Sequence, residues 1–350
     1  MRGDTKVKRQ VVLIAVGLLI AAVALAGCGG QGPTGQGGNA PAGQGQATGS
    51  VVIKYAVVGP DEHPYTIMAT KFKELVEAKT NGQVQVTIFP NAQLGSEREM
   101  AEGVRMGTIQ MTTVTTDGTL PAWVPELQIF SLPYLFRDRD HAYKVMDGDI
   151  GKELGDKLLA QGLRSLGFCE LGWRHFTNNV RPILKPEDAQ GLKIRVQEAK
   201  VWFGLVKALG ATPTPIPFGE LYTALQQRTV DGEENPVATI RSMKFYEVQK
   251  YLTLDGHTYS PGSVLINSKF YDGLSPDIQK AIQDSATEAI LYQRQVIAQK
   301  ETEDLQFLKD KGMEVAEPDR NAFVEVTKNV PQEVADMVPL ELVDRVRNTK

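Results

Sequence analysis

The feature that most constrains the fold is a long helical stretch near the C-terminal end of the chain. Ser275 and Pro276 form an N-cap and a first helical residue, and neither Gly nor Pro occurs again until Gly312. About 36 helical residues at ~1.5 Å each span roughly 54 Å, which is longer than one globular lobe. The helix should therefore contact two lobes unless it bends. A coiled-coil dimerisation helix is the alternative, although the apolar residues keep no strict heptad.

Strand and helix patterns alternate along the preceding chain. Alternating apolar residues predict strands at Val51–Val57 and Val84–Phe89, and an apolar stripe from Tyr65 to Val76 predicts a helix between them. The following segments predict a helix at 97–106 capped by Ser96, and strands at 109–114, 163–171 and 175–179. About 300 residues arranged in this way indicate an α/β protein with more than one lobe.

The N-terminus resembles a bacterial lipoprotein signal peptide. Arg2 and three further basic residues precede an uncharged apolar run from Val11 to Ala26, and Leu25-Ala26-Gly27-Cys28 follows the pattern of a cleavage box. The run is shorter than the ~20 residues that a spanning helix needs. We therefore expect residues 1–27 to be removed and Cys28 to carry a lipid; a retained signal anchor is the alternative.

Residues 28–50 contain almost only small and uncharged side chains after Cys28, so they should form a flexible linker. Cys169 is the one other cysteine of the chain; with Cys28 lipidated it has no partner for an intramolecular disulfide, and its apolar neighbours predict a buried thiol. The formal net charge of the whole chain is −4. Residues 1–27 carry four basic residues and one acidic residue, a net charge of +3, so the remainder carries −4 − 3 = −7. This charge, without a basic patch, argues against a nucleic-acid partner.

A candidate carboxylate-binding residue lies in the segment 191–196, Gly-Leu-Lys-Ile-Arg-Val. Its apolar residues alternate, so Lys193 and Arg195 should point to the opposite face of a strand. Arg195 then lies near the C-terminal end of that strand, where open α/β sheets bind ligands, and its planar guanidinium matches a carboxylate. A surface arginine on a half-exposed strand is the alternative.

The next residues extend this pattern. A helical stripe at 202–209 ends at Gly210, and residues 212–217 should run extended into a second helix that begins at Phe218. Residues 230–236, Val-Asp-Gly-Glu-Glu-Asn-Pro, are expected to form a turn that presents Asn235 before another helix.

Four motifs in this region resemble those of a known family. Gly-Leu-Lys-Ile-Arg, Pro-Phe-Gly-Glu-Leu-Tyr-Thr-Ala-Leu-Gln, Asp-Gly-Glu-Glu-Asn-Pro and Lys-Phe-Tyr-Glu-Val-Gln-Lys-Tyr-Leu follow the order of the solute-binding subunits of tripartite ATP-independent periplasmic (TRAP) transporters, the DctP family. The likeness extends from about Val51 to about Gly312. It implies a two-lobe periplasmic-binding-protein-like fold, with hinge strands and the long helix backing both lobes. The lobe boundaries expected are 51–172 and 261–300 for lobe I, and 173–260 and 301–350 for lobe II.

The resemblance also implies roles for individual residues. Arg195 would form the main salt bridge to a ligand carboxylate, Arg174 would add a second cation, and Asn235 would hydrogen-bond the same group. Phe218 and Trp173 would enclose the ligand. Lobe I would contribute contacts from the loop 58–65 after its first strand, including His63, and from residues 115–117, including Thr115 and Asp117. For Arg174, the alternative is a structural ion pair with Glu170 or Asp188.

Glu198 departs from one branch of this family, because the sialic-acid binders carry a polar amide three residues after the clamp arginine. An acid at this position could bind a ligand hydroxyl or amine, or it could pair with Lys200 or Arg174. Sialic acid is therefore not the expected ligand.

Other function classes fit these residues less well. Glu233 and Glu234 could form a glycosidase-like pair, but adjacent residues on an extended segment point in opposite directions. No nucleophile elbow, phosphate loop or zinc motif occurs in the sequence, and no cofactor or metal is expected. The binding lipoprotein of an ATP-driven transporter and a ligand-sensing subunit remain alternatives.

The sequence thus predicts a binding protein held by lipid at the outer face of the cell membrane. It would capture a small organic acid, such as a C4-dicarboxylate or a uronate, and deliver it to the small and large membrane subunits of a TRAP permease.

Overall fold

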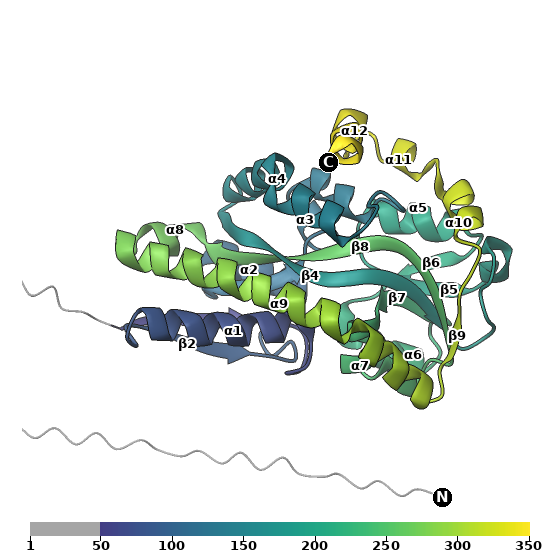
Figure 1. Cartoon of the computed structure of the whole chain (residues 1–350), viewed down its shortest axis with the longest axis horizontal. Coiled ribbons are helices and arrows are strands. Elements are labelled where there is room, and N and C mark those ends of the chain that lie inside the picture. Colours follow the sequence, from purple (N-terminus) through teal and green to yellow (C-terminus); the bar gives the residue numbers. More distant parts are fainter. Residues whose placement is uncertain (1–49) are drawn as a thin grey trace, which may run out of the picture. The chain divides into compact units, whose positions relative to one another are not determined.

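The computed structural model describes residues 50–350, which belong to one compact unit and are drawn as coloured ribbons in Figure 1. The predicted signal peptide, Cys28 and the linker up to residue 49 lie outside the described residues. Within residues 50–350, no helix combines the length and the apolar character that crossing a membrane requires.

Nine strands form one sheet with parallel pairs at both ends and long antiparallel strands in the middle. The order is β2-β1-β3-β8-β4-β7-β5-β6, and β9 pairs with β8. β1 is parallel to β2 and β3, and β5 is parallel to β6 and β7, whereas β8 is antiparallel to β3 and β4. The strands are β1 Val51–Ala56, β2 Val84–Phe89, β3 Met111–Thr115, β4 Leu163–Asn178, β5 Lys193–Val196, β6 Thr212–Pro215, β7 Gly232–Pro236, β8 Tyr251–Asn267 and β9 Glu314–Ala316.

β4 corrects the prediction of two separate strands at 163–171 and 175–179. It is one strand of 16 residues, and its pairing with β8 shifts register at three places. Gly167 (φ 137°) and Gly172 (φ 123°) lie at two of these irregularities, and both have the positive φ that glycine adopts most easily. Gly172, which follows the end of the first predicted strand, therefore marks a bulge within a continuous strand.

β7 corrects a second prediction, because residues 232–236 form a central strand rather than a turn. β7 lies between β4 and β5, and all five of its residues are buried. A Cβ at Gly232 would lie 2.1 Å from the Thr177 carbonyl oxygen, so only glycine permits this close approach. Polar residues and a proline gave no strand signal in the sequence.

Helices cover the sheet, and most of those predicted are present. Ser96 caps α2 with a capping box to Glu99, as its spacing indicated. The helices are α1 Pro64–Lys79, α2 Glu97–Met106, α3 Arg139–Asp147, α4 Asp149–Leu159, α5 Lys200–Ala208, α6 Leu221–Gln226, α7 Val237–Ser242, α8 Ser268–Asp272, α9 Pro276–Asp310, α10 Arg320–Thr327, α11 Val330–Glu333 and α12 Leu340–Asn348. Phe218 begins a short 3-10 helix, Phe218–Glu220, that leads into α6.

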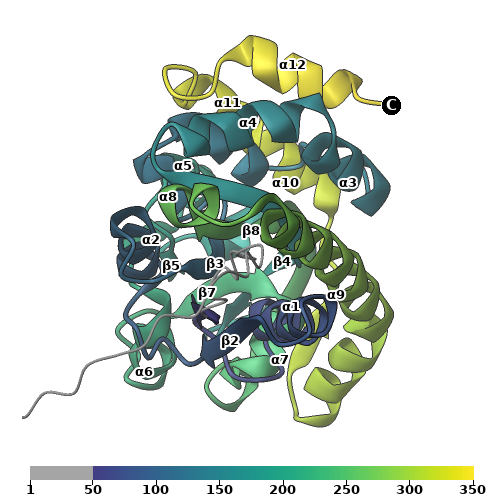
Figure 2. The same cartoon turned by 90° about the vertical axis from the view of Figure 1, so that its left-hand side faces the viewer.

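The long helix α9 contacts both ends of the sheet, as its length predicted. It runs beside α1 and continues to α7 (Figures 1 and 2). Ile282 belongs to the hydrophobic cluster around β1, and Leu308 belongs to a separate cluster around α6 and α7. The helix therefore packs within the described unit along its length, instead of presenting a free coiled-coil face.

Separate hydrophobic cores at the two ends of the sheet agree with a two-lobe fold. Ile53 and Phe72 belong to the core around β1, which also holds the buried free thiol Cys169. Ile194 and Trp202 belong to a second core at the β5 end. The C-terminal residues Val330 to Val346 pack with the β1 core. The predicted lobe boundaries assign residues 301–350 to lobe II, and these boundaries stay a prediction.

Candidate ligand-binding cavity

A cavity lies where side chains from the two ends of the sheet meet. Its empty volume is about 270 Å³. Six of the residues singled out from the sequence line it: His63, Thr115, Arg174, Arg195, Phe218 and Asn235. The other lining residues are Val58, Tyr65, Glu97, Leu171, Gln197 and Thr239. Segments that are far apart in the sequence therefore supply one enclosed site.

Arg195 presents its guanidinium to this cavity from β5. The residue is 3% exposed, so it is not the half-exposed surface arginine of the alternative interpretation. Its Nε donates a hydrogen bond to the Ile216 carbonyl oxygen at 2.9 Å, and the guanidinium lies 5.9 Å from the Phe218 ring centre. Within residues 50–350, the two terminal Nη groups have no hydrogen bond or ion pair to protein. They remain available as two parallel donors.

The charge of Arg195 is retained despite its burial. Burial lowers the pKa of Arg195 to about 10, and the nearby Glu234 carboxylate partly offsets this effect. The guanidinium is therefore still cationic at neutral pH. A buried cation without a paired anion is costly, so this group favours a carboxylate next to its Nη atoms.

Arg174 also lines the cavity, but its charge is already neutralised. Its Nε lies 2.5 Å from Glu234 Oε2, and its Nη2 lies 2.8 Å from Glu234 Oε1 and donates to Asn235 Oδ1 at 3.2 Å. The predicted alternative partners, Glu170 and Asp188, are wrong, because β7 brings Glu234 next to Arg174 on β4. Burial alone would raise the pKa of Glu234, but Arg174 and a hydrogen bond from His257 hold it below its usual value.

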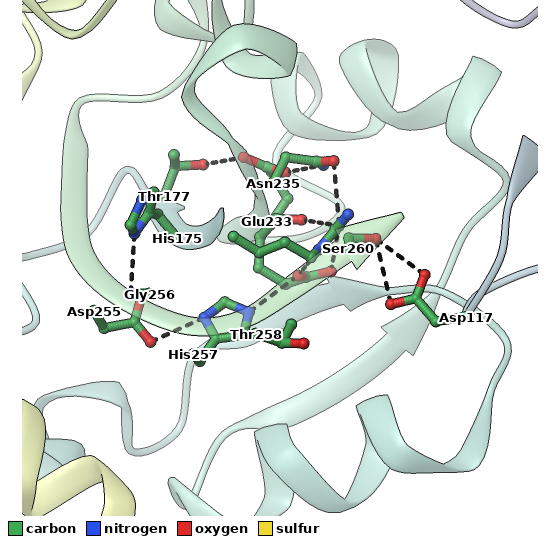
Figure 3. Close-up of polar contacts among 12 residues, drawn as sticks. Asp117, His175, Thr177, Glu233, Asn235, Asp255, Gly256, His257, Thr258 and Ser260 are labelled. Atoms are coloured by element: carbon green, nitrogen blue, oxygen red, sulfur yellow. Dashed lines mark hydrogen bonds and ion pairs between the residues drawn. The ribbon is translucent and has the colours of Figure 1, made fainter. Parts of the chain in front are cut away.

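His257 continues this network away from the cavity. Its Nε2 lies 3.1 Å from Glu234 Oε2, and its Nδ1 lies 2.9 Å from Asp255 Oδ2 (Figure 3). Burial lowers the pKa of His257, but the two carboxylates more than compensate and raise it to about 9. The buried ring is therefore a cation at neutral pH.

Glu233 and Asn235, two residues apart on β7, are buried and hydrogen-bonded to each other through their side chains. Thr177 Oγ1 donates to Glu233 Oε1 at 2.7 Å, and Asn235 Nδ2 donates to the other carboxylate oxygen (Figure 3). Burial raises the pKa of Glu233 to about 7. The Asn235 amide is thus held from both ends, by Glu233 and by Arg174.

His63 forms part of the cavity wall at the start of α1. Its Nδ1 accepts a hydrogen bond from the Tyr65 N–H at 3.2 Å, and its ring lies 5.1 Å from the Tyr65 ring and 6.0 Å from the Phe218 ring. Burial lowers the pKa of His63 to about 3, so the ring is neutral and carries its proton on Nε2. Gly59 makes room for this ring, because a Cβ there would lie 2.2 Å from His63 Cγ.

Three residues predicted for the site lie elsewhere. Trp173 packs against Tyr259 at 5.3 Å and lines a separate surface pocket with Asp255. Asp117 is buried and accepts a hydrogen bond from Ser260 Oγ at 3.0 Å (Figure 3). Glu198 is exposed and pairs with Arg98, not with Lys200 or Arg174.

Three polar lining residues, Glu97, Gln197 and Thr239, were missed by sequence reasoning, whereas Tyr65 ends the loop 58–65 from which contacts were expected. Gln197 could have been found, because it lies two residues after Arg195 on the same face of an extended segment. Glu97, the first residue of α2, accepts hydrogen bonds from Thr115 N at 3.1 Å and Thr119 Oγ1 at 2.7 Å. Thr239 carries no comparable signal, since a helical residue of this kind usually belongs to the core.

Comparison with known proteins decides the family. Residues 55–337 match the model of DctP, bacterial extracellular solute-binding protein, family 7. The chain belongs to this family. DctP-family membership makes it an extracytoplasmic solute-binding protein of the TRAP type and not an enzyme. The cavity described above, between the two ends of the sheet, is the candidate ligand site of this DctP-family protein.

Several characterised DctP-family relatives are similar over most of their length. The 2,3-diketo-L-gulonate-binding periplasmic protein YiaO of Escherichia coli K12 is 40% identical over 291 residues, covering 80% of this chain and 88% of the relative. The C4-dicarboxylate-binding periplasmic protein DctP of Rhodobacter capsulatus is 36% identical over 302 residues, covering 85% and 90%. A TRAP periplasmic solute-binding protein of Polaromonas sp. JS666, solved with D-erythronate, has a TM-score of 0.83 and 40% identity, covering 86% of this chain and 99% of that one.

Proposed function

We propose that this protein captures a small organic acid through Arg195 and delivers it to the small and large membrane subunits of a TRAP permease. The observation that carries the proposal is the Arg195 guanidinium: it is buried, it lines an enclosed cavity, and its Nη groups have no protein partner within residues 50–350. A carboxylate supplies both the matching charge and two acceptor oxygens. An ion gradient across the membrane would drive the transport step.

The size of the cavity supports a small ligand. The side chains that line it leave little free space, because residues from both ends of the sheet close around it. The relatives named above bind a diketo sugar acid, C4-dicarboxylates or a four-carbon sugar acid. These ligands share a carboxylate, which is the group that Arg195 is placed to bind.

Closure of the two lobes around the ligand completes the proposed mechanism. Arg98 with Glu198, and His63 with Phe218, are contacts between residues of the β1 end and residues of the β5 end of the sheet. Separating the lobes would break these contacts and open the cavity to water. Bringing them together around an acid removes water from the Arg195 ion pair and strengthens it.

Anchoring at the membrane forms the remaining part of the proposal. Cys28 follows a cleavage box in the sequence and would carry a lipid that holds the protein at the outer face of the cell membrane. Cys28→Ser would then abolish incorporation of a labelled lipid precursor while ligand affinity stays unchanged. A substituted protein that still acquires lipid would contradict the anchoring proposal.

Arg195→Lys tests the binding site directly. Lysine keeps the charge but loses the two-point fork, so the affinity for the cognate acid should fall by about 2 to 4 kcal/mol, roughly thirty- to a thousandfold. Isothermal titration measures this loss, and Lys193→Gln is the matched control, because Lys193 lies two residues earlier on β5 and is exposed. An affinity of the Arg195→Lys protein within threefold of the unsubstituted protein would remove Arg195 from the site.

A further inference from the structure

The cavity contains charges that leave only one carboxylate to be bound. Arg174 is neutralised by Glu234, and the buried His63 ring is neutral. Glu97 adds a carboxylate to the wall on the β1 side, where its oxygens accept from Thr115 and Thr119. Among the residues that line the cavity, Arg195 is therefore the one cation without a paired anion.

The same cavity also contains buried polar atoms that lack a protein partner. Within residues 50–350, Tyr65 Oη, Gln197 Nε2 and Thr239 Oγ1 are buried and make no hydrogen bond, and all three residues line the cavity. Buried polar groups in proteins are almost always hydrogen-bonded. Three such atoms around one small cavity therefore indicate a ligand with several polar groups of its own.

The Gln197 side chain is held in place from the opposite end of the sheet. A Cβ at Gly118, which follows β3, would lie 1.8 Å from Gln197 Oε1 and 2.4 Å from its Cδ. The amide therefore occupies the space that a side chain at position 118 would take. This packing fixes the amide at the cavity wall, where its Nε2 has no other partner.

We propose that the cavity selects a short polyhydroxylated monocarboxylate, an acid of the aldonate type, over a dicarboxylate of the same length. This inference rests on the proposed function, since it assigns the ligand carboxylate to Arg195. The ligand hydroxyls accept hydrogen bonds from Tyr65 and Gln197 and donate to Glu97. Thr239 can act in either direction, because a hydroxyl both donates and accepts.

The discrimination follows from what each ligand leaves unpaired. A second carboxylate has no free cation to pair with, faces the Glu97 carboxylate, and cannot donate to it. An acid without hydroxyls leaves the Tyr65, Gln197 and Thr239 atoms unsatisfied. Sites built to hydrogen-bond a hydroxyl reject analogues that lack it much more strongly than apolar pockets reject a change in size.

Three four-carbon acids test the inference by isothermal titration of the purified protein. D-erythronate has hydroxyls on a monocarboxylate, butyrate has none, and succinate has a second carboxylate. We expect D-erythronate to bind at least a hundredfold more tightly than either of the others. D-galactonate, hexanoate and adipate form the same comparison at six carbons, in case the cavity prefers the longer chain.

Single substitutions identify the contacts. Tyr65→Phe and Thr239→Val remove one hydroxyl each with little change in volume. Each variant should bind the preferred hydroxy acid about tenfold more weakly. The affinity for the hydroxyl-free acid should stay unchanged, so the ratio of the two affinities falls by the same factor. Glu97→Gln removes the negative charge and should reduce the ratio between the affinities for the hydroxy acid and for the dicarboxylate about tenfold. A substitution that only disturbs the fold would weaken the binding of all three acids by the same factor.

The possible outcomes separate this inference from the proposed function. Tighter binding of succinate or adipate, or equal binding of the three acids in both sets, overturns the inference, although Arg195→Lys would still weaken that binding. Equal losses for all acids in the Tyr65 and Thr239 variants also overturn it. If no acid of either set binds, or if the Arg195→Lys protein binds its acid with an affinity within threefold of the unsubstituted protein, the proposed capture of a small organic acid by Arg195 is itself wrong.

Discussion

Arg98 and Glu198 form an ion pair, with Arg98 Nη1 and Glu198 Oε2 3.1 Å apart. Arg98 belongs to α2 at the β1 end of the sheet, and Glu198 follows β5 at the other end. Both side chains are at least half exposed, at 50% and 64%. The pair therefore joins the two ends of the sheet at the surface, and the Glu198 carboxylate is directed to Arg98 and not to the cavity.

Glu198→Gln should accordingly leave ligand affinity nearly unchanged. Exposed ion pairs contribute about 0 to 1 kcal/mol, so titration should give an affinity for the preferred acid within about fivefold of the unsubstituted protein. Arg98→Gln removes the other partner and should have the same small effect. A loss of a hundredfold or more in the Glu198 variant alone would place this carboxylate in contact with the ligand.

Gly118→Ala should weaken ligand binding without contacting the ligand. The added methyl group would lie 1.8 Å from Gln197 Oε1, so the amide must move from the cavity wall, and we expect about a tenfold loss of affinity by titration. Gly155→Ala, in helix α4, is the matched control, because a Cβ at Gly155 would lie at an ordinary 3.6 Å from the Cβ of Ser165 on β4. Equal affinities for the two variants would show that the position of Gln197 is unimportant for binding.

Stability should fall as pH rises from about 6.5 to 9, because of His257. Its pKa is raised from 6.5 to about 9 in the folded protein, so its contribution is complete below pH 6.5 and is lost as pH rises through 9. A pKa difference of this size corresponds to roughly 3 kcal/mol. The free energy of unfolding, measured by urea titration at several pH values, should show this decline.

Two histidine variants test the assignment of this pH dependence. His257→Gln removes the titrating group and should flatten the slope between pH 7 and 9. His175→Gln should keep the slope, because burial lowers the pKa of His175 to about 4 and its ring is neutral throughout this range. A slope that persists in the His257 variant would assign the proton to another group.

Gln293→Leu should destabilise the fold markedly. Gln293 on α9 accepts from the Glu170 N–H at 3.0 Å and donates to the Glu170 carbonyl at 2.6 Å. Glu170 pairs in register with Pro261, which has no N–H to donate, so Gln293 replaces the missing strand partner. Leaving both buried groups unpaired should cost about 2 to 5 kcal/mol in the free energy of unfolding.

Gln283→Leu provides the control on the same helix. Gln283 makes one hydrogen bond to β4, from Nε2 to the Leu166 carbonyl oxygen at 3.0 Å, and is only partly buried. In urea titration, the decrease in the free energy of unfolding caused by Gln283→Leu should be less than half of that caused by Gln293→Leu. Equal decreases for the two variants would mean that β4 does not depend on Gln293 as the partner of Glu170.

The sequence predicted the elements whose signals are local. Ser96 and Ser275 marked the starts of α2 and α9, and the alternation around Arg195 indicated which way its side chain points. β7 could not be predicted, because its strand is defined by neighbours on both sides and by a buried polar network, not by apolar alternation. The partners of Arg174 were missed for a related reason: Glu234 is 60 residues away, and only the pairing of β4 with β7 brings the two together.

The long strands β4 and β8 run without interruption through the middle of the sheet, and their ladder joins its two ends. Within residues 50–350, these two strands connect the two cores, so neither core can unfold and leave the other with its sheet edges paired. Heating should then melt both in one cooperative step. If the lobes close as proposed, the motion that admits a ligand bends this hydrogen-bonded ribbon, mainly where its register shifts, and little chain entropy is lost when the bend reverses.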